Sequence, residues 1–203
     1  QIFESIEKKP IAAASLGQVH KGKTRSGREV AIKIQRPGIH KETSIDLKAL
    51  ENIASFLDNH TEVGQKYQFT RIVESLKNSL NRELDYLKEK QQLNLMRENL
   101  SQFKSIVVPK PYSQYCSKRI LTMDYINATN ITSLSQVALL NLDSSKLAKE
   151  LFRSYLYQVL VCGFFHADPH PGNINLTENG KIAILDLGMI ASLSPKHRND
   201  LLK

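Results

Sequence analysis

The 203-residue sequence has few of the features that mark secreted, zinc-stabilised or membrane-spanning proteins. Its two cysteines, Cys116 and Cys162, lie far apart without CxxC spacing, which argues against a disulfide framework or a zinc site. No signal peptide is visible, and the longest apolar run, residues 159–165, is far too short to span a bilayer. Internal repeats and low-complexity segments are also missing. The composition therefore predicts a globular protein of a reducing compartment.

The two common glycine-rich signatures for binding phosphate are missing as well. There is no Walker A motif, which excludes a P-loop NTPase, and no G-x-G-x-x-G. Where a kinase would carry its glycines, residues 10–18 read P-I-A-A-A-S-L-G-Q. Alanine has a Cβ, so this backbone has fewer φ/ψ options and approaches phosphates less freely than glycines would. This segment is the most specific feature of the N-terminal half.

The charge balance is basic, with 28 lysines and arginines against 20 acidic residues and a formal net charge of +8. Such an excess favours polyanionic partners: nucleotide phosphates, nucleic acid or an anionic membrane surface. The basic residues are scattered, which is typical of a solvated mixed-charge surface. The tyrosines and phenylalanines do not alternate with basic residues as in nucleic-acid binders, so no nucleic-acid partner is expected.

The hydrophobic patterning predicts an α+β chain in two parts. Strands are expected over 10–20 and 28–34, joined by a turn at Ser26-Gly27, and later over 106–108 and 119–125. Helices are expected over 43–60, over 69–100 with Thr70 as N-cap, and over 144–165, whose apolar end predicts burial. An Asn-Gly turn joins strands 173–176 and 181–185. We expect a hinge near residue 126, and the abrupt ends of the sequence suggest a fragment of a longer protein.

Three oxygen-bearing side chains in the C-terminal half form a pattern suited to phosphoryl transfer. Asp168 lies in His166-Ala-Asp-Pro-His-Pro-Gly-Asn173, and Asp186 follows an apolar strand in Asp-Leu-Gly188. Carboxylate and amide oxygens suit Mg2+, which takes one or two carboxylates plus substrate phosphates. We therefore expect Asp168 to orient a nucleophile, and Asn173 and Asp186 to hold Mg2+ beside ATP. His166 is expected to brace the loop, and His170 is a weak candidate for a ligand.

A lysine upstream completes the pattern. Lys33 ends Val-Ala-Ile-Lys, in which a strand lysine grips the α- and β-phosphates and pairs with a helix glutamate. Glu83 and Glu89 both lie on the next long predicted helix. Six residues place them about 120° apart around it, so one lysine does not easily meet both. The pattern leaves the choice between them open.

Taken together, these motifs resemble the UbiB (ADCK) family of atypical kinase-like ATPases. The resemblance rests on A-A-A-S-x-G-Q-V-H, V-A-I-K-x-Q-x-P-G, E-L-D-x-x-x-E, F-F-H-A-D-P-H-P-G-N and L-D-L-G-M, in order along the whole chain. It implies a two-lobed protein-kinase-like fold with an antiparallel sheet in an N-lobe, residues 1–126, and a partial, mostly helical C-lobe, residues 127–203.

The resemblance also implies roles for individual residues. Lys33 would bind phosphate, Glu89 would pair with it, and Asp168 would complete the catalytic set. Glu83 and Asp85 fall on a regulatory E-x-D motif. Nucleotide contacts are implied for the alanine-rich segment and for the strand that enters the hinge: Ala12, Ala13, Ala14, Ser15, Gly17, Gln18, Met123, Asp124 and Tyr125.

The family supports the biosynthesis or homeostasis of isoprenoid quinones and prenyl lipids, and is typically membrane-associated. This implies partners among quinone-biosynthesis proteins or prenyl lipids, and a place in the cytoplasm or on the stromal or matrix side of an organelle membrane. The family's K-x-G-Q extension and the end of its second lobe are not in this sequence, and Asn127-Ala128 stands where a glycine is common. Two alternatives remain: a small-molecule kinase resembling aminoglycoside or choline kinases, and a catalytically inert nucleotide-binding module.

Overall fold

The structure is a computed structural model that describes residues 2–14, 16–134, 143–168 and 170–201. Its first sheet has the strand order β1-β3-β4-β6, with β2 paired to β3. All of its pairings are antiparallel. The strands are β1 (Phe3–Ile6), β2 (Ala12–Ala14), β3 (Gly17–Thr24), β4 (Glu29–Gln35) and β6 (Ile120–Asp124).

The predicted strand over 10–20 is divided in the structure. β2 and β3 form a tight hairpin that pairs Ala14 with Gly17, and β1 is a strand that the pattern did not predict. The turn at Ser26-Gly27 is confirmed, because Gly27 has a φ of 81° and its N–H bonds back to the Thr24 carbonyl at 2.9 Å. Only a residue that tolerates positive φ fits this turn.

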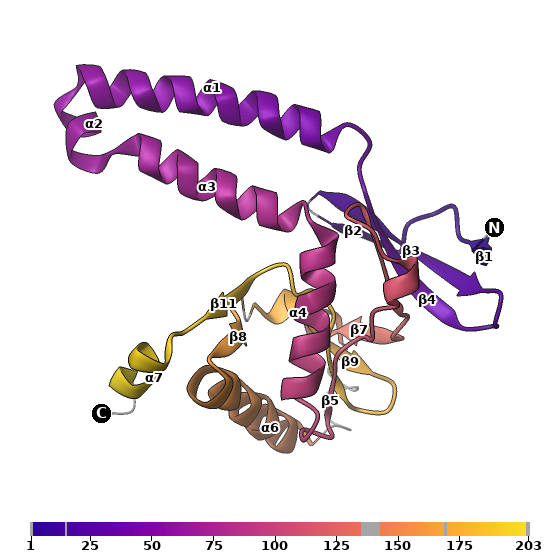
Figure 1. Cartoon of the computed structure of the whole chain (residues 1–203). Coiled ribbons are helices and arrows are strands. Elements are labelled where there is room, and N and C mark those ends of the chain that lie inside the picture. Colours follow the sequence, from indigo (N-terminus) through magenta and orange to yellow (C-terminus); the bar gives the residue numbers. More distant parts are fainter. Residues whose placement is uncertain (1, 15, 135–142, 169, 202–203) are drawn as a thin grey trace.

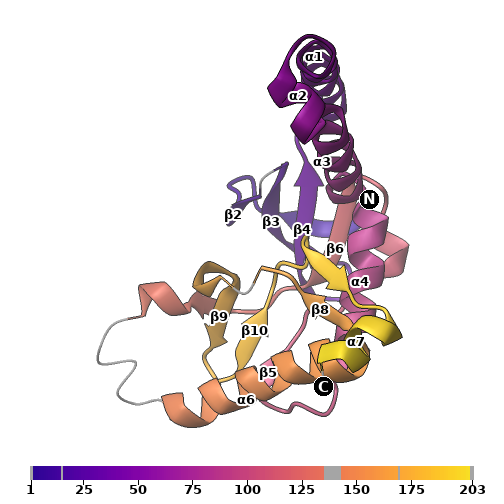
Figure 2. The ribbon, with the colours of Figure 1, turned by 90° about the vertical axis from the view of Figure 1, so that its left-hand side faces the viewer.

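Three helices that extend away from the two sheets lie between β4 and α4 (Tyr86–Asn99) in the chain; we call them the helical excursion. It consists of α1 (Ile39–His60), α2 (Glu62–Tyr67) and α3 (Phe69–Glu83). Figures 1 and 2 show α1 and α3 lying side by side and extending away from the rest of the molecule. α1 begins four residues earlier than predicted. Thr70 is not an N-cap: α3 follows Gln68, and the Thr70 hydroxyl donates to the Asp58 carboxylate at 2.7 Å.

The helix predicted over 69–100 is broken. α3 ends at Glu83 and α4 (Tyr86–Asn99) starts after Asp85, whose carboxylate accepts a bond from the Leu87 N–H at 3.2 Å. Asp is a preferred N-cap because its side chain satisfies a backbone donor that the helix leaves unpaired. α4 therefore has its own start and its own direction.

The second sheet has the strand order β5-β10-β9-β7. The predicted Asn-Gly hairpin is confirmed as the antiparallel pair β9–β10. β5 belongs to this sheet although it precedes β6 in the chain, because it pairs in parallel with β10. A separate two-stranded ladder joins β8 and β11. The bounds are β5 (Ile106–Val107), β7 (Ala128–Asn130), β8 (Phe164–His166), β9 (Ile174–Thr177), β10 (Ile182–Ile184) and β11 (Ile190–Ser192).

The helix predicted over 144–165 ends much earlier. α6 (Ser144–Leu156) continues as a π-helical segment, Tyr157–Cys162, and Gly163 then turns the chain into β8 with a φ of 63°. The predicted burial of its apolar end is found only in part: most of residues 159–165 are half-buried, but Val161 is 56% exposed. The last helix is α7 (Pro195–Leu201), and short 3-10 turns cover Ser113–Tyr115, Ile131–Ser133 and Pro171–Asn173.

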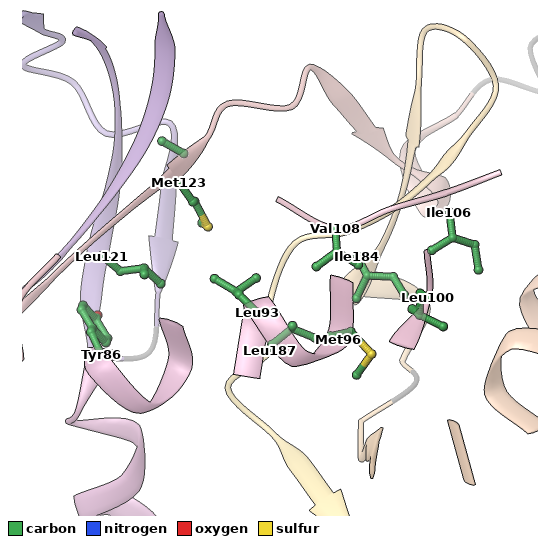
Figure 3. Close-up of a cluster of buried hydrophobic side chains, with 11 residues drawn as sticks. Tyr86, Leu93, Met96, Leu100, Ile106, Val108, Leu121, Met123, Ile184 and Leu187 are labelled. Carbon is green, nitrogen blue, oxygen red and sulfur yellow. The ribbon is translucent and has the colours of Figure 1, made fainter. Parts of the chain in front are cut away.

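One hydrophobic core joins the two sheets through α4. Leu93 and Met96 of this helix are fully buried and belong to a cluster with residues of both sheets, as Figure 3 shows. Leu121 and Met123 enter it from β6, and Ile184 enters it from β10. Because α4 contributes side chains to the core shared by both sheets, it fixes how they face each other.

Candidate nucleotide-binding site

A cavity of about 200 Å³ lies between the first sheet and the segment after β10. Its walls come from the alanine hairpin, from the facing strands β3, β4 and β6, from α4, and from the start of the Asp-Leu-Gly segment. Its lining is largely apolar with a few charged groups, as expected of a small-molecule site. The lining residues are Ile11, Ala12, Ala13, Ala14, Val19, Ala31, Lys33, Glu89, Pro109, Met123, Asp124, Tyr125, Ile126, Leu185 and Asp186.

Lys33 and Glu89 form a buried ion pair at one end of this cavity. The Lys33 Nζ donates to both carboxylate oxygens of Glu89, at 2.8 and 2.9 Å. Both residues are buried, with 9% and 7% of their surface exposed. The structure thus brings Glu89 to the lysine and leaves Glu83 at the end of α3. The period of the helix alone does not make that choice.

Burial and charge oppose each other in this pair. Burial lowers the pKa of Lys33, but the carboxylates of Glu89 and Asp186 outweigh it, so the pKa is raised. Burial raises the pKa of Glu89, and the attraction of Lys33 only partly offsets this. Lys33 also lies over the ring of Tyr86, with 5.2 Å between Nζ and the ring centroid. Lys33 is therefore positively charged at neutral pH and places this charge in the cavity wall.

Asp186 faces the same lysine from the segment that follows β10. Its carboxylate oxygen lies 3.7 Å from the Lys33 Nζ and accepts a bond from the Gly188 N–H at 3.0 Å. Its side chain is 60% exposed, so the carboxylate is open to a ligand in the cleft. An exposed carboxylate beside a buried lysine places an open oxygen ligand and a positive charge next to each other, and such oxygens suit Mg2+.

His166 ties the catalytic loop to the Asp186 segment. Its Nδ1 accepts a bond from the Asp168 N–H at 3.1 Å, so its Nε2 carries the proton and donates to the Asp186 carbonyl at 2.7 Å. The ring is 3% exposed. This is the bracing arrangement expected for His166. The exposed His170 instead accepts a bond from the Gly172 N–H at 3.0 Å within its own turn.

Asn173 and Asp168 contact each other directly. The Asn173 amide donates to the Asp168 carboxylate at 2.9 Å and to its carbonyl at 3.2 Å. This orients the amide so that its oxygen points away from Asp168 and is available to a cation. Neither residue lines the cavity itself. Within the described residues no cluster of three or more His, Cys, Asp or Glu side chains forms. Carboxylate and amide oxygens of this kind suit Mg2+ that also binds substrate phosphates.

The remaining residues predicted to contact nucleotide fall into three groups. Ala12, Ala13 and Ala14 line the cavity, whereas Gly17 and Gln18 do not, and Ser15 lies outside the described residues. Met123, Asp124 and Tyr125 line it. The Asp124 carboxylate accepts from the Tyr112 hydroxyl and the Lys110 N–H, and the Asp124 N–H donates to the Lys110 carbonyl at 3.0 Å.

Gly17 has a packing role that its sequence position does not show. A Cβ on this residue would lie 2.4 Å from the Ile34 carbonyl oxygen and 2.7 Å from the Tyr86 hydroxyl. Every side chain other than hydrogen would collide there. Glycine at this position therefore lets β3 and β4 close over Tyr86, whose burial raises its pKa to about 12.

Sequence reasoning did not single out several walls of the cavity. Val19 and Ala31 face it from β3 and β4, and Pro109, Ile126 and Leu185 complete it. Alternation in the two strands was a usable signal for the first two, since every second residue of a strand shares a face. No local pattern marks the other three, because their position depends on how the two sheets meet.

The comparison with protein families shows which family the chain belongs to. The model of the ABC1 atypical kinase-like domain matches residues 1–203. The chain belongs to the ABC1 atypical kinase-like family. The predicted resemblance to the UbiB (ADCK) family is thereby confirmed, and the fold is that of a kinase-like domain.

ABC1 relatives occur in bacteria, plants and animals. The chain is 38% identical over 206 residues to Protein ACTIVITY OF BC1 COMPLEX KINASE 8, chloroplastic, of Arabidopsis thaliana, covering all of this chain and 27% of that protein. It is 33% identical to AarF domain-containing kinase 1 of Drosophila melanogaster, covering 98% of this chain and 39% of that one. The chain thus spans well under half the length of these two relatives.

A solved structure has the same fold. The complex of Rv3197 with erythromycin, from Mycobacterium tuberculosis, matches with a TM-score of 0.75 and 26% identity, covering 94% of this chain and 47% of that one.

Proposed function

We propose that this ABC1 domain binds ATP with Mg2+ in the cleft between its two sheets, for phosphoryl transfer or hydrolysis. The observation that carries the proposal is the buried Lys33–Glu89 pair with the exposed Asp186 carboxylate 3.7 Å from the same lysine. In Mg–ATP the nucleobase would lie in the apolar cavity, the phosphates beside the lysine and the metal beside the open carboxylate.

Each group has a separate task in this proposal. The alanine hairpin and the main chain of β6 enclose the base, Lys33 binds phosphate, and Glu89 holds Lys33 in place. Asn173 and Asp186 would hold Mg2+, which neutralises charge on the phosphates when bound. Asp168 would orient the nucleophile, with His166 fixing its loop. The cavity, about 200 Å³, is smaller than typical ligand sites of 300–1,000 Å³, so the phosphates would lie in the open cleft beside it.

A thermal-shift titration tests the nucleotide site. Wild type should gain roughly 2.7 kcal/mol of stability at a hundredfold excess of Mg–ATP over its Kd. Lys33→Ala and Asp186→Asn should each lose most of this gain. Lys77→Ala, which removes an exposed ion pair with Glu51 in the helical excursion, is the control and should keep it. Retention of the full gain by both site variants would refute the assignment.

We further propose that the domain serves isoprenoid quinone or prenyl-lipid homeostasis beside a membrane, on the stromal, matrix or cytoplasmic side. The family resemblance, the chloroplastic relatives and the net charge of +8 support this. No helix in the described part of the chain has the length and apolarity to cross a bilayer. Because of its net charge of +8, the chain should co-sediment with anionic vesicles, and more strongly when they contain a prenyl quinone. Equal binding to vesicles with and without quinone would contradict the proposed recognition of prenyl lipids.

A further inference from the structure

Gln35 lies two residues beyond Lys33 on β4 and is buried, with 6% of its surface exposed. Its side-chain amide donates to the Leu84 carbonyl at 2.7 Å and to the Lys118 carbonyl at 3.3 Å. Both acceptors are carbonyls, so the orientation of the amide is fixed: its nitrogen must face them. Its oxygen is 3.0 Å from the His40 Nε2, which donates to it. All the hydrogen-bonding groups of this side chain are used.

The carbonyl that Gln35 binds is at the break between α3 and α4. Leu84 is the C-cap of α3, and its carbonyl is one of those that a helix end leaves without a partner. Two residues later the Tyr86 N–H donates to the same Lys118 carbonyl at 3.1 Å. Gln35 and Lys118 therefore hold the end of α3 and the start of α4 together.

Two side chains thus connect β4 to the start of α4. Lys33 and Gln35 lie about 6.6 Å apart along the strand and share one face. Glu89 lies four residues, roughly 6 Å along the helix axis, beyond Asp85 at the break. Lys33 meets Glu89 and Gln35 meets Leu84, so the second contact sets the position and starting direction of the helix that carries the glutamate.

We propose that Gln35 is a positioning residue for phosphate binding. By holding the Leu84 carbonyl it fixes where α4 starts, and thereby keeps the Glu89 carboxylate in place for Lys33. His40 holds the amide in this orientation from the first turn of α1. The inference rests on the proposed function, because the pair it positions is the one assigned to phosphate.

Gln35→Met tests this, since methionine keeps the length of the side chain and removes both donors. The Kd values of Mg–ATP and of adenosine are measured by competition against a fluorescent nucleotide. The Kd of Mg–ATP should rise about tenfold, the size of a lost hydrogen bond of about 1.4 kcal/mol. Adenosine has no phosphates and should bind within about twofold of wild type. Gln65→Met, at an exposed glutamine of α2, is the matched control.

A double-mutant cycle separates positioning from general destabilisation. In a Glu89→Gln background Gln35→Met should add less than about twofold to the Kd of Mg–ATP, because the pair it positions is already gone. Additive effects, an equal loss of adenosine binding, or no difference from Gln65→Met would each overturn the proposal. If circular dichroism shows Gln35→Met to be unfolded, His40→Ala takes its place, with a smaller rise of about threefold and the same criteria.

The proposed function fails in a different way. It fails if wild type binds Mg–ATP no more tightly than adenosine, or if Lys33→Ala leaves that preference intact. If Lys33→Ala abolishes the preference while Gln35→Met and His40→Ala both leave it unchanged, the nucleotide site stands and the positioning role of Gln35 is refuted.

Discussion

At the scale of single residues, burial determines what Lys33 and Glu89 contribute. Removing two charges from water is expensive, and their attraction offsets that cost only when the geometry is good. Here the two short bonds at 2.8 and 2.9 Å supply that geometry. Removing one partner leaves the other buried without compensation. Replacing either residue alone should therefore destabilise the fold, because the remaining charge stays buried without its partner.

Lys33→Met should destabilise the domain in a pH-dependent way. Burial already raises the pKa of Glu89, and loss of the lysine's attraction raises it further. When the pKa of a carboxyl is higher in the folded protein than its unfolded value of about 4.3, the folded state binds the proton more tightly. The free energy of unfolding then falls as the pH rises from about 4.3 to the folded pKa. We expect the variant to lose about 3–5 kcal/mol relative to wild type at pH 8 and clearly less at pH 5.

Urea unfolding at the two pH values, followed by circular dichroism, measures this loss. Lys77→Met removes the lysine of an exposed pair, whose partner Glu51 is 42% exposed, and should show a small effect at both pH values. A loss for Lys33→Met that is equal at pH 5 and pH 8 would mean that Glu89 is not the group left uncompensated.

At the scale of elements, local patterns predicted the turns and several strands, but not β1, β7, β8 or β11. The hairpins at Gly27 and at Asn179-Gly180 follow from residues that tolerate a positive φ, and such information is contained in a few neighbouring positions. Motif spacing likewise identified Lys33, Asp168, Asn173 and Asp186 as candidate site residues. The structure brings Lys33 and Asp186 to one cavity, and joins Asp168 to Asn173 by a hydrogen bond.

The helix boundaries required information from distant parts of the chain. The apolar stripe continues from α3 into α4, so periodicity alone predicts one helix. Gln35 and Lys118, distant in sequence, stabilise the break by binding the backbone at Leu84 and Tyr86. The choice of Glu89 over Glu83 has the same origin, because the break redirects the helix after Glu83. A helical period cannot predict a change of direction that a distant side chain stabilises.

The end of α6 shows a second limit of patterning. The run 159–165 is apolar, and an apolar run predicts burial without showing which element covers it. In the structure Gln158 is buried while Val161 is 56% exposed, because the π-helical turns rotate the side chains away from the α-helical stripe. The buried Gln158 oxygen accepts a bond from the His166 N–H at 3.1 Å, so the π-helical segment contacts the start of the loop that carries Asp168.

At the scale of the whole molecule, the core that surrounds α4 makes the two sheets depend on each other. Leu93 is fully buried and belongs to a cluster that includes β4 and β6 of the first sheet and β5 and β10 of the second. β5 strengthens the connection, since it precedes β6 in the chain yet pairs with β10. A smaller cluster, formed by Val30 and Ile32 of β4 with Tyr112, does not include α4.

Leu93→Ala should therefore weaken both sheets together. Removing a fully buried leucine side chain costs about 2–5 kcal/mol, through lost burial and the cavity left behind. Because the cluster is shared, unfolding should remain a single transition, shifted to lower urea. Far-UV circular dichroism and tyrosine fluorescence should report the same midpoint. Leu95→Ala, at a residue of the same helix that is 41% exposed, should shift the midpoint far less. Two separated transitions in the Leu93 variant would show that the sheets are held by independent cores, and that α4 does not set the geometry of the cleft between them.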